Sequence, residues 1–85
     1  MSLAPEQTLT LDSDTIAVLF ELLGRWVEGG KLEALKPNLE HEAEAWALND
    51  LFCVLETVID PGVAGGFVGA RTRLMAFHGN FDYPA

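Results

Sequence analysis

Cysteine and basic residues are scarce in this sequence. Cys53 is the sole cysteine, so no disulfide can form within the chain. Five lysines and arginines stand against thirteen acidic residues, for a net charge of −8, and none of the five lies between Pro37 and Asp60. Because nucleic acid binding depends on basic side chains that neutralise phosphates, we expect no nucleic acid partner. An acidic face of this kind suits a basic protein partner, or it serves solubility alone.

Long apolar runs are also missing. No stretch approaches the roughly 20 apolar residues of a membrane-spanning helix, and no basic region followed by an apolar stretch opens the chain. We therefore expect a soluble, cytoplasmic protein without membrane contact. The 85 residues, 49% of them hydrophobic, predict one globular domain over 1–85. A domain this small usually needs a disulfide, a metal or self-association for stability.

The spacing of apolar residues predicts an all-α fold. Two long antiparallel helices are expected at about 12–29 and 38–59, and a shorter third helix at about 61–78. An N-terminal tail or short extended segment, 1–11, precedes them, and a C-terminal tail, 79–85, follows. These elements fit a three-helix bundle or, in a dimer, a four-helix-type bundle.

The first predicted helix has an unusually wide apolar surface. Asp12 is a suitable N-cap, and the pair Gly29-Gly30 ends the helix. Trp26 belongs to the main apolar stripe, whereas Val18 and Leu22 lie beside it and widen the apolar arc to roughly 200°. One neighbouring helix cannot cover so wide an arc, which predicts a further contact.

The second predicted helix, capped by Asn38, carries apolar side chains on two faces. Its main stripe is ordinary core, but Trp46, Asp50 and Cys53 form a second stripe, with Asn49 beside it. Either the third helix or the C-terminal tail covers this second stripe within one chain, or the stripe is an interface. Tryptophan is enriched at interface hot spots, which favours the interface.

The third predicted helix is ambiguous at its start. Asp60-Pro61 fits an N-cap and a first helical residue, and the apolar spacing from Val63 to Phe77 favours a helix throughout. The glycines within 62–69 oppose it, because each costs about 1 kcal/mol relative to alanine in a helix. The alternative is a loop through Gly66 followed by a shorter helix. If helical, the glycines form a smooth side that another backbone can approach closely.

Chemistry-bearing residues are few. His41 and Glu44 are one helical turn apart and could hold a metal, but the first helix offers no inward-facing carboxylate to complete a site. Cys53 lies within a helix, away from the helix N-terminus or the cations that activate a thiol. We therefore expect no catalytic residues, no metal and no cofactor.

These features predict a non-enzymatic helical interaction or regulatory module that self-associates, most simply as a two-fold dimer. The alternative is a domain that binds a small ligand or metal in a pocket near Trp46, Asp50, Cys53 and the glycine segment 62–69. The predicted interface consists of Val18, Leu22, Trp26, Trp46, Asn49, Asp50 and Cys53.

Overall fold

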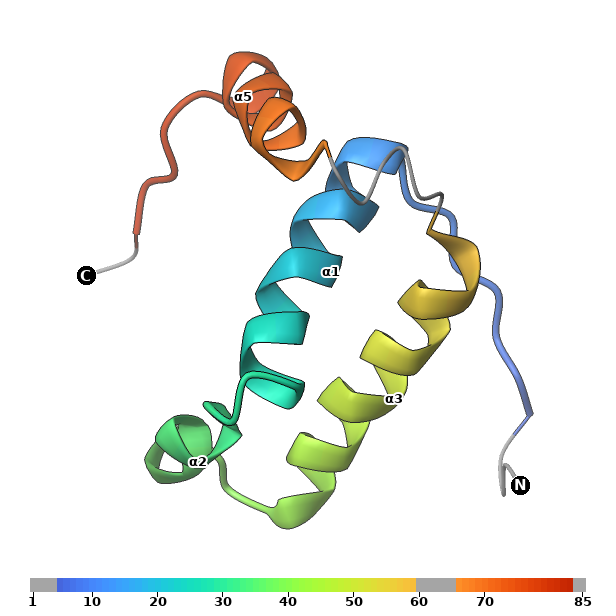
Figure 1. Ribbon diagram of the computed structural model, residues 1–85, viewed down its shortest axis with the longest axis vertical. Helices are drawn as coiled ribbons and strands as arrows, with labels where there is room; N and C mark the ends of the chain where they lie inside the picture. The colour runs from blue at the N-terminus through green and yellow to red at the C-terminus, as the bar shows by residue number, and fades with distance from the viewer. Residues whose placement is uncertain (1–4, 60–65, 84–85) are drawn as a thin grey trace.

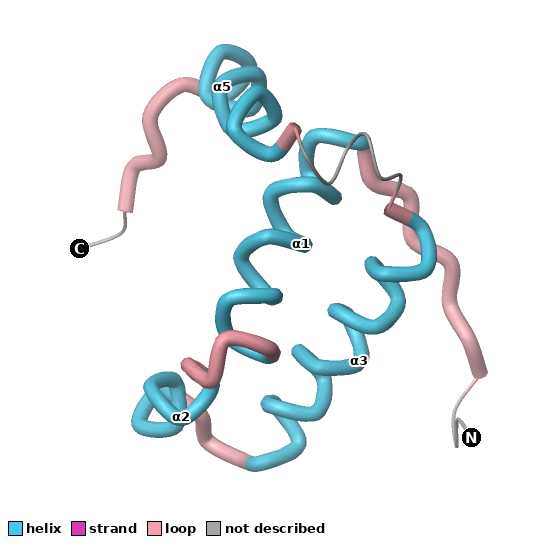
Figure 2. The backbone as a smooth tube through the Cα atoms, in the orientation of Figure 1, coloured by secondary structure: helices cyan, strands magenta, loops and turns pink. Residues whose placement is uncertain are grey.

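A computed structural model describes residues 5–59 and 66–83 of the chain (Figure 1). The described elements are α1 (Ser13–Val27), α2 (Leu32–Leu35), the 3₁₀ helix η1 (Lys36–Asn38), α3 (Glu42–Val58) and α5 (Phe67–His78). Figure 2 shows only helices and loops in this part of the chain. The all-α class expected from the sequence is therefore confirmed, and residues 5–11 of the expected N-terminal segment form neither helix nor strand.

The core lies between α1 and α3, which run antiparallel side by side (Figure 1). Leu23 of α1 is buried against Phe52 and Leu55 of α3. The rings of Phe20 and Phe52 stack at 5.3 Å between centroids. Gly24 adjoins the same ring, since a Cβ there would lie 3.5 Å from Phe52. These contacts place the middle of α1 level with the middle of α3.

Both ends of α1 follow local sequence signals. The Asp12 carboxylate caps the helix by accepting hydrogen bonds from the backbone N–H of Thr15 at 2.8 Å and from its hydroxyl at 3.0 Å. These bonds lower the pKa of Asp12 below its ordinary value, because they favour the ionised carboxylate. At the other end a Cβ on Gly29 would meet the Arg25 carbonyl oxygen at 2.3 Å, so only glycine fits there. Gly30 has a φ of 72°, which also favours glycine.

The second long helix begins later than expected. Asn38 does not cap it but ends η1, and α3 begins at Glu42 after His41. Pro37 fits the first turn of a 3₁₀ helix, where its missing N–H is not needed. The His41 Nδ1 atom then accepts a hydrogen bond from the Ala43 N–H at 3.0 Å and serves as the N-cap. Histidine is an uncommon cap, which is why the sequence pointed to Asn38 instead.

Helix α5 packs against α1, near the N-terminal end of α1 (Figure 1). Ala17 and Ala70 are 2% and 1% exposed, so small side chains allow the two helices to approach closely. The Arg73 guanidinium binds the Asp14 carboxylate, with its Nη2 at 2.8 Å and its Nε at 3.0 Å. This contact raises the pKa of Arg73 above its ordinary value. A Cβ on Gly69 would lie 3.2 Å from that guanidinium, so glycine leaves room for the ion pair.

The third helix differs from the expected 61–78 in its described part. It begins at Phe67, with Gly66 as its N-cap, and ends at His78 before Gly79, which has a φ of 79°. The expected capping residues Asp60 and Pro61 lie outside the described residues, as do Gly62 and Gly65. Among the described elements, α1 has extensive contacts with both α3 and α5, and these contacts do not establish the expected three-helix bundle.

The chain is more open than its length requires. Its radius of gyration is 14.4 Å, whereas a compact domain of 85 residues has about 12 Å. Within the described residues, the buried apolar side chains are Ala17, Leu23, Phe52, Leu55 and Ala70. No helix of the described part is long and apolar enough to cross a membrane. Much apolar surface therefore remains outside the core.

Candidate interaction surfaces

α1 and α3 lie side by side and form a layer, which has two sides. One side carries an apolar face, whose residues have the same spacing along the sequence in both helices. Leu22 directly precedes the buried Leu23, and Val54 directly precedes the buried Leu55. Each therefore points about 100° away from the core, in the same rotational sense. α1 and α3 run antiparallel and face each other. Side chains that are rotated by the same angle from the core direction of each helix therefore point to the same side of the layer.

Three apolar residues from each helix follow this rule, at spacings of three and four. The apolar face consists of Leu19, Leu22 and Trp26 of α1 and of Leu51, Val54 and Val58 of α3. Leu19, Trp26 and Leu51 also reach the core and are partly buried. Val54 and Val58 are each 58% exposed. The face therefore continues the core outward to solvent.

The other side of the layer is different in character. Ala17 and Asn49 precede Leu23 and Leu55 by six residues each, which turns them about 120° the opposite way. On α1, α5 packs along the outer edge that adjoins this side, where Ala17 is buried and Asp14, about 180° from the core direction of Leu23, binds Arg73. On α3 it carries Asn49 together with Glu42 and Glu56, at similar offsets from the core.

A third surface, the tryptophan stripe, follows the outer edge of α3. It consists of Trp46, Asp50, Cys53 and Thr57, which lie about 140° to 180° from the core direction of Leu55. Trp46 is 67% exposed and Cys53 is exposed. The Cys53 thiol accepts a long hydrogen bond from the Asn49 amide, at 3.9 Å. Because Trp46 and Cys53 are both exposed, the described residues do not bury this stripe, and the packing under the third helix considered from the sequence is not found among them.

The seven residues of the predicted interface therefore do not share one surface. Leu22 and Trp26 lie on the apolar face, and Val18 lies on the outer edge of α1 next to it. Trp46, Asp50 and Cys53 lie on the opposite edge of the layer, on α3, and Asn49 adjoins them. One flat contact cannot include both groups in full, because of the second group only Asp50 is tilted toward the apolar face. The set remains a prediction, but the geometry divides it in two.

Sequence reasoning did not single out Leu51, Val54 and Val58 as an exposed surface, because their spacing fits ordinary core. The signal that finds them is the repeat between helices. Residues 19, 22 and 26 have the same positions relative to Leu23 as residues 51, 54 and 58 have relative to Leu55. Only the antiparallel arrangement of the two helices brings these two intervals to the same side.

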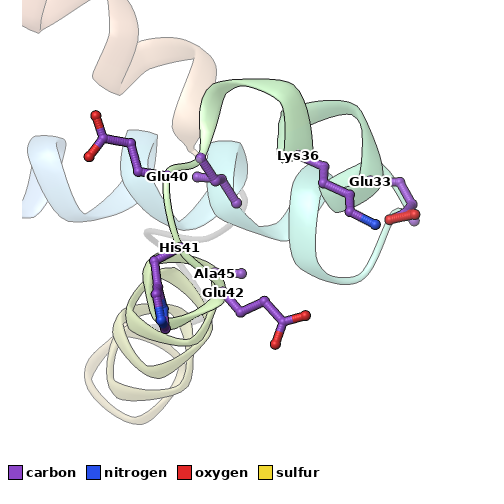
Figure 3. Close-up of a pocket in the computed structure, with 8 residues that line it drawn as sticks. Glu33, Lys36, Glu40, His41, Glu42 and Ala45 are labelled. Carbon is purple, nitrogen blue, oxygen red and sulfur yellow. The ribbon is translucent and has the colours of Figure 1, made fainter.

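Two shallow hollows lie at the N-terminal end of α3. One, of about 590 Å³, is lined by Gly30, Glu33, Lys36, Leu39, Glu40, His41, Glu42 and Ala45 (Figure 3). The side chains of Glu33, Glu40 and Glu42 point in different directions there (Figure 3). The other, of about 470 Å³, is lined by Val27, Glu42, Ala45, Trp46 and Asn49. Trp46 lines the second hollow, whereas Asp50, Cys53, Gly66 and Gly69 line neither of these two.

The charged first turn of α3 is occupied by capping. His41 Nδ1 holds the Ala43 N–H, and a Glu44 carboxylate oxygen accepts from the Glu40 N–H at 2.9 Å. Both candidate metal ligands therefore satisfy backbone groups at the helix start. In the described residues, no three histidine, cysteine or acidic side chains gather in a way that could hold a metal ion.

Comparison of the chain with protein-family models, with curated proteins and with solved structures gave no match. The surfaces of the molecule are therefore the features that point to a function.

Proposed function

We propose that this chain is a non-enzymatic helical interaction module that self-associates. The observation that supports the proposal is the exposure of large apolar side chains on folded helices, which includes Phe77 of α5 at 84%, Trp46 at 67% and the two valines of the apolar face at 58%. Exposed apolar surface on ordered elements is typical of interaction sites, whereas scattered single residues are ordinary. On α1 and α3 the exposed residues belong to two surfaces, the apolar face and the tryptophan stripe.

The two surfaces suit different roles. The tryptophan stripe lies on α3, whose described residues carry Glu42, Glu44, Asp50 and Glu56 and no lysine or arginine. A protein segment with basic and apolar side chains complements such a stripe, because tryptophan supplies contact area and the carboxylates steer a cation. We assign this stripe to a basic protein partner and the self-association to another part of the surface.

The test of self-association is the molar mass in solution. Size-exclusion chromatography with light scattering at micromolar concentration is expected to give about 18.6 kDa, twice the chain mass of 9.3 kDa. A mass that stays at that of one chain up to high micromolar concentration contradicts the proposal. Elemental analysis and native mass spectrometry of the same sample test the non-enzymatic alternative of a ligand carrier, which requires a bound metal or small molecule.

A further inference from the structure

We propose that the apolar face is the surface through which two copies of this chain associate, packed face to face around a four-helix core. This inference rests on the self-association proposed above and specifies where it occurs. The occupant of the face is a second copy of the chain, so the same six residues contribute from each side, as a two-fold interface requires.

The composition of the face fits the centre of an interface. None of its six residues is polar, and interface centres are depleted of charged side chains and enriched in large apolar ones. Thr15 is the polar neighbour on the same side of α1, and its hydroxyl is already bonded to Asp12. Apart from the indole N–H of Trp26, the face therefore has no polar group that needs a new partner when water leaves it.

The chain as a whole exposes more surface than a compact single chain of its mass. The chain exposes 6993 Å², whereas a compact single chain of this mass exposes about 5,000 Å². The exposed tails, residues 5–12 and 79–83, contribute to the difference of about 2,000 Å². A standard interface removes about 800 Å² from each partner, which is less than this difference, but the difference is shared between the tails, α5 and the apolar face.

The charges on α1 and α3 favour one relative orientation of the two copies in the dimer. α3 has four acidic residues and no basic one among its described residues, so α3 against α3 of the second copy places like charges together. α1 contains Arg25, which is 57% exposed beside Glu21. The favourable arrangement packs α1 of each copy against α3 of the other, with the two-fold axis parallel to the helices.

This arrangement brings one oppositely charged pair to the rim. Because Gly24 adjoins Phe52, Arg25 is level with residues 49–51 of α3. Arg25 and Asp50 both point to the outer edges of the layer, tilted toward the apolar face. Rotation about a two-fold axis parallel to the helices leaves the position of each residue along that axis unchanged. Arg25 of one copy therefore faces Asp50 of the other.

Val54→Glu tests the face, and Val68→Glu is its matched control. The two valines are 58% and 56% exposed and lie on different helices, and both changes add one carboxylate. Val54→Glu is expected to raise the dimer dissociation constant at least ~100-fold, because it buries an unpaired charge in the interface. Val68→Glu is expected to change it less than about threefold. Circular dichroism checks that both variants keep their helices, and a Val54→Glu variant that associates as tightly as the control overturns the inference.

Measurements on the wild type and on further variants separate this inference from the proposed function. A wild-type chain that stays monomeric overturns both. A wild-type dimer that Trp46→Glu disrupts and Val54→Glu does not overturns the apolar face and leaves self-association standing. For the orientation, Arg25→Glu and Asp50→Arg should each weaken the dimer several-fold, and the double variant should recover the loss. Losses that simply add contradict the pairing of α1 with α3.

Discussion

Two surfaces of the α1–α3 layer differ in how they are covered. On the outer edge of α1, near its N-terminal end, α5 packs where Ala17 and Ala70 are buried and where Arg73 binds Asp14. On the apolar face, by contrast, the core continues to solvent, with Val54 and Val58 more than half exposed. The chain thus covers the side of α1 with small and polar residues itself and leaves the more apolar face open. Since burying apolar surface is the main gain in folding and association, the open side is where a partner gains most.

The covered side should be sensitive to side-chain size. Ala70→Leu inserts three carbon atoms between α5 and α1, which is expected to cost about 1–3 kcal/mol of stability and to lower Tm by roughly 5–15 °C. Ala76→Leu, at an exposed position of the same helix, is the control and should leave Tm nearly unchanged. Thermal unfolding by circular dichroism measures both. Equal effects of the two changes would show that α5 does not pack on α1 through Ala70.

The N-terminal end of α1 should respond to pH, whereas the apolar face has no titratable group. The hydrogen bonds from Thr15 lower the pKa of Asp12 in the folded state, so the carboxylate stabilises the fold above its unfolded pKa of 3.8. That contribution is lost as the pH falls through the lowered folded value. Asp12→Ala is therefore expected to reduce Tm by a few degrees at pH 7, with less effect at pH 2.

Asp12→Asn is the matched variant for this prediction. Asparagine retains an oxygen that accepts from the Thr15 N–H but does not titrate, so Tm at pH 7 should stay near that of the wild type. Its dependence on pH between 5 and 2 should be flatter. An unchanged acid dependence in Asp12→Asn would show that other carboxylates determine it.

Much of the local structure could be predicted because its signals are local. The cap at Asp12, the stop at Gly29-Gly30 and the apolar stripes of both long helices depend on neighbours within a few residues. The start of α3 was wrong by about four residues, because a 3₁₀ turn at Lys36–Asn38 and a histidine cap replaced the expected cap at Asn38. Histidine caps depend on side-chain orientation, which no pattern of residue types reveals.

The surfaces were harder to predict because they depend on how helices are placed. The sequence indicated that Val18 and Leu22 exceed what one neighbour covers, and that Trp46 and Cys53 need an explanation. It could not show that α5 packs on α1 and that Trp46 and Cys53 stay exposed. Nor could it show that Leu22 and Val54 share a side, since this follows from the antiparallel packing. Periodicity fixes the face of a helix, and tertiary contacts decide what that face meets.

The two tryptophans offer the most direct test of the central claim, because Trp26 lies on the apolar face and Trp46 on the outer edge of α3. Trp46→Phe leaves Trp26 as the sole tryptophan reporter, and Trp26→Phe leaves Trp46. On dilution through the dimer dissociation constant, the emission of Trp26 is predicted to shift to longer wavelength as the face becomes solvated, while that of Trp46 stays constant. A shift of Trp46 with Trp26 unchanged would contradict the account.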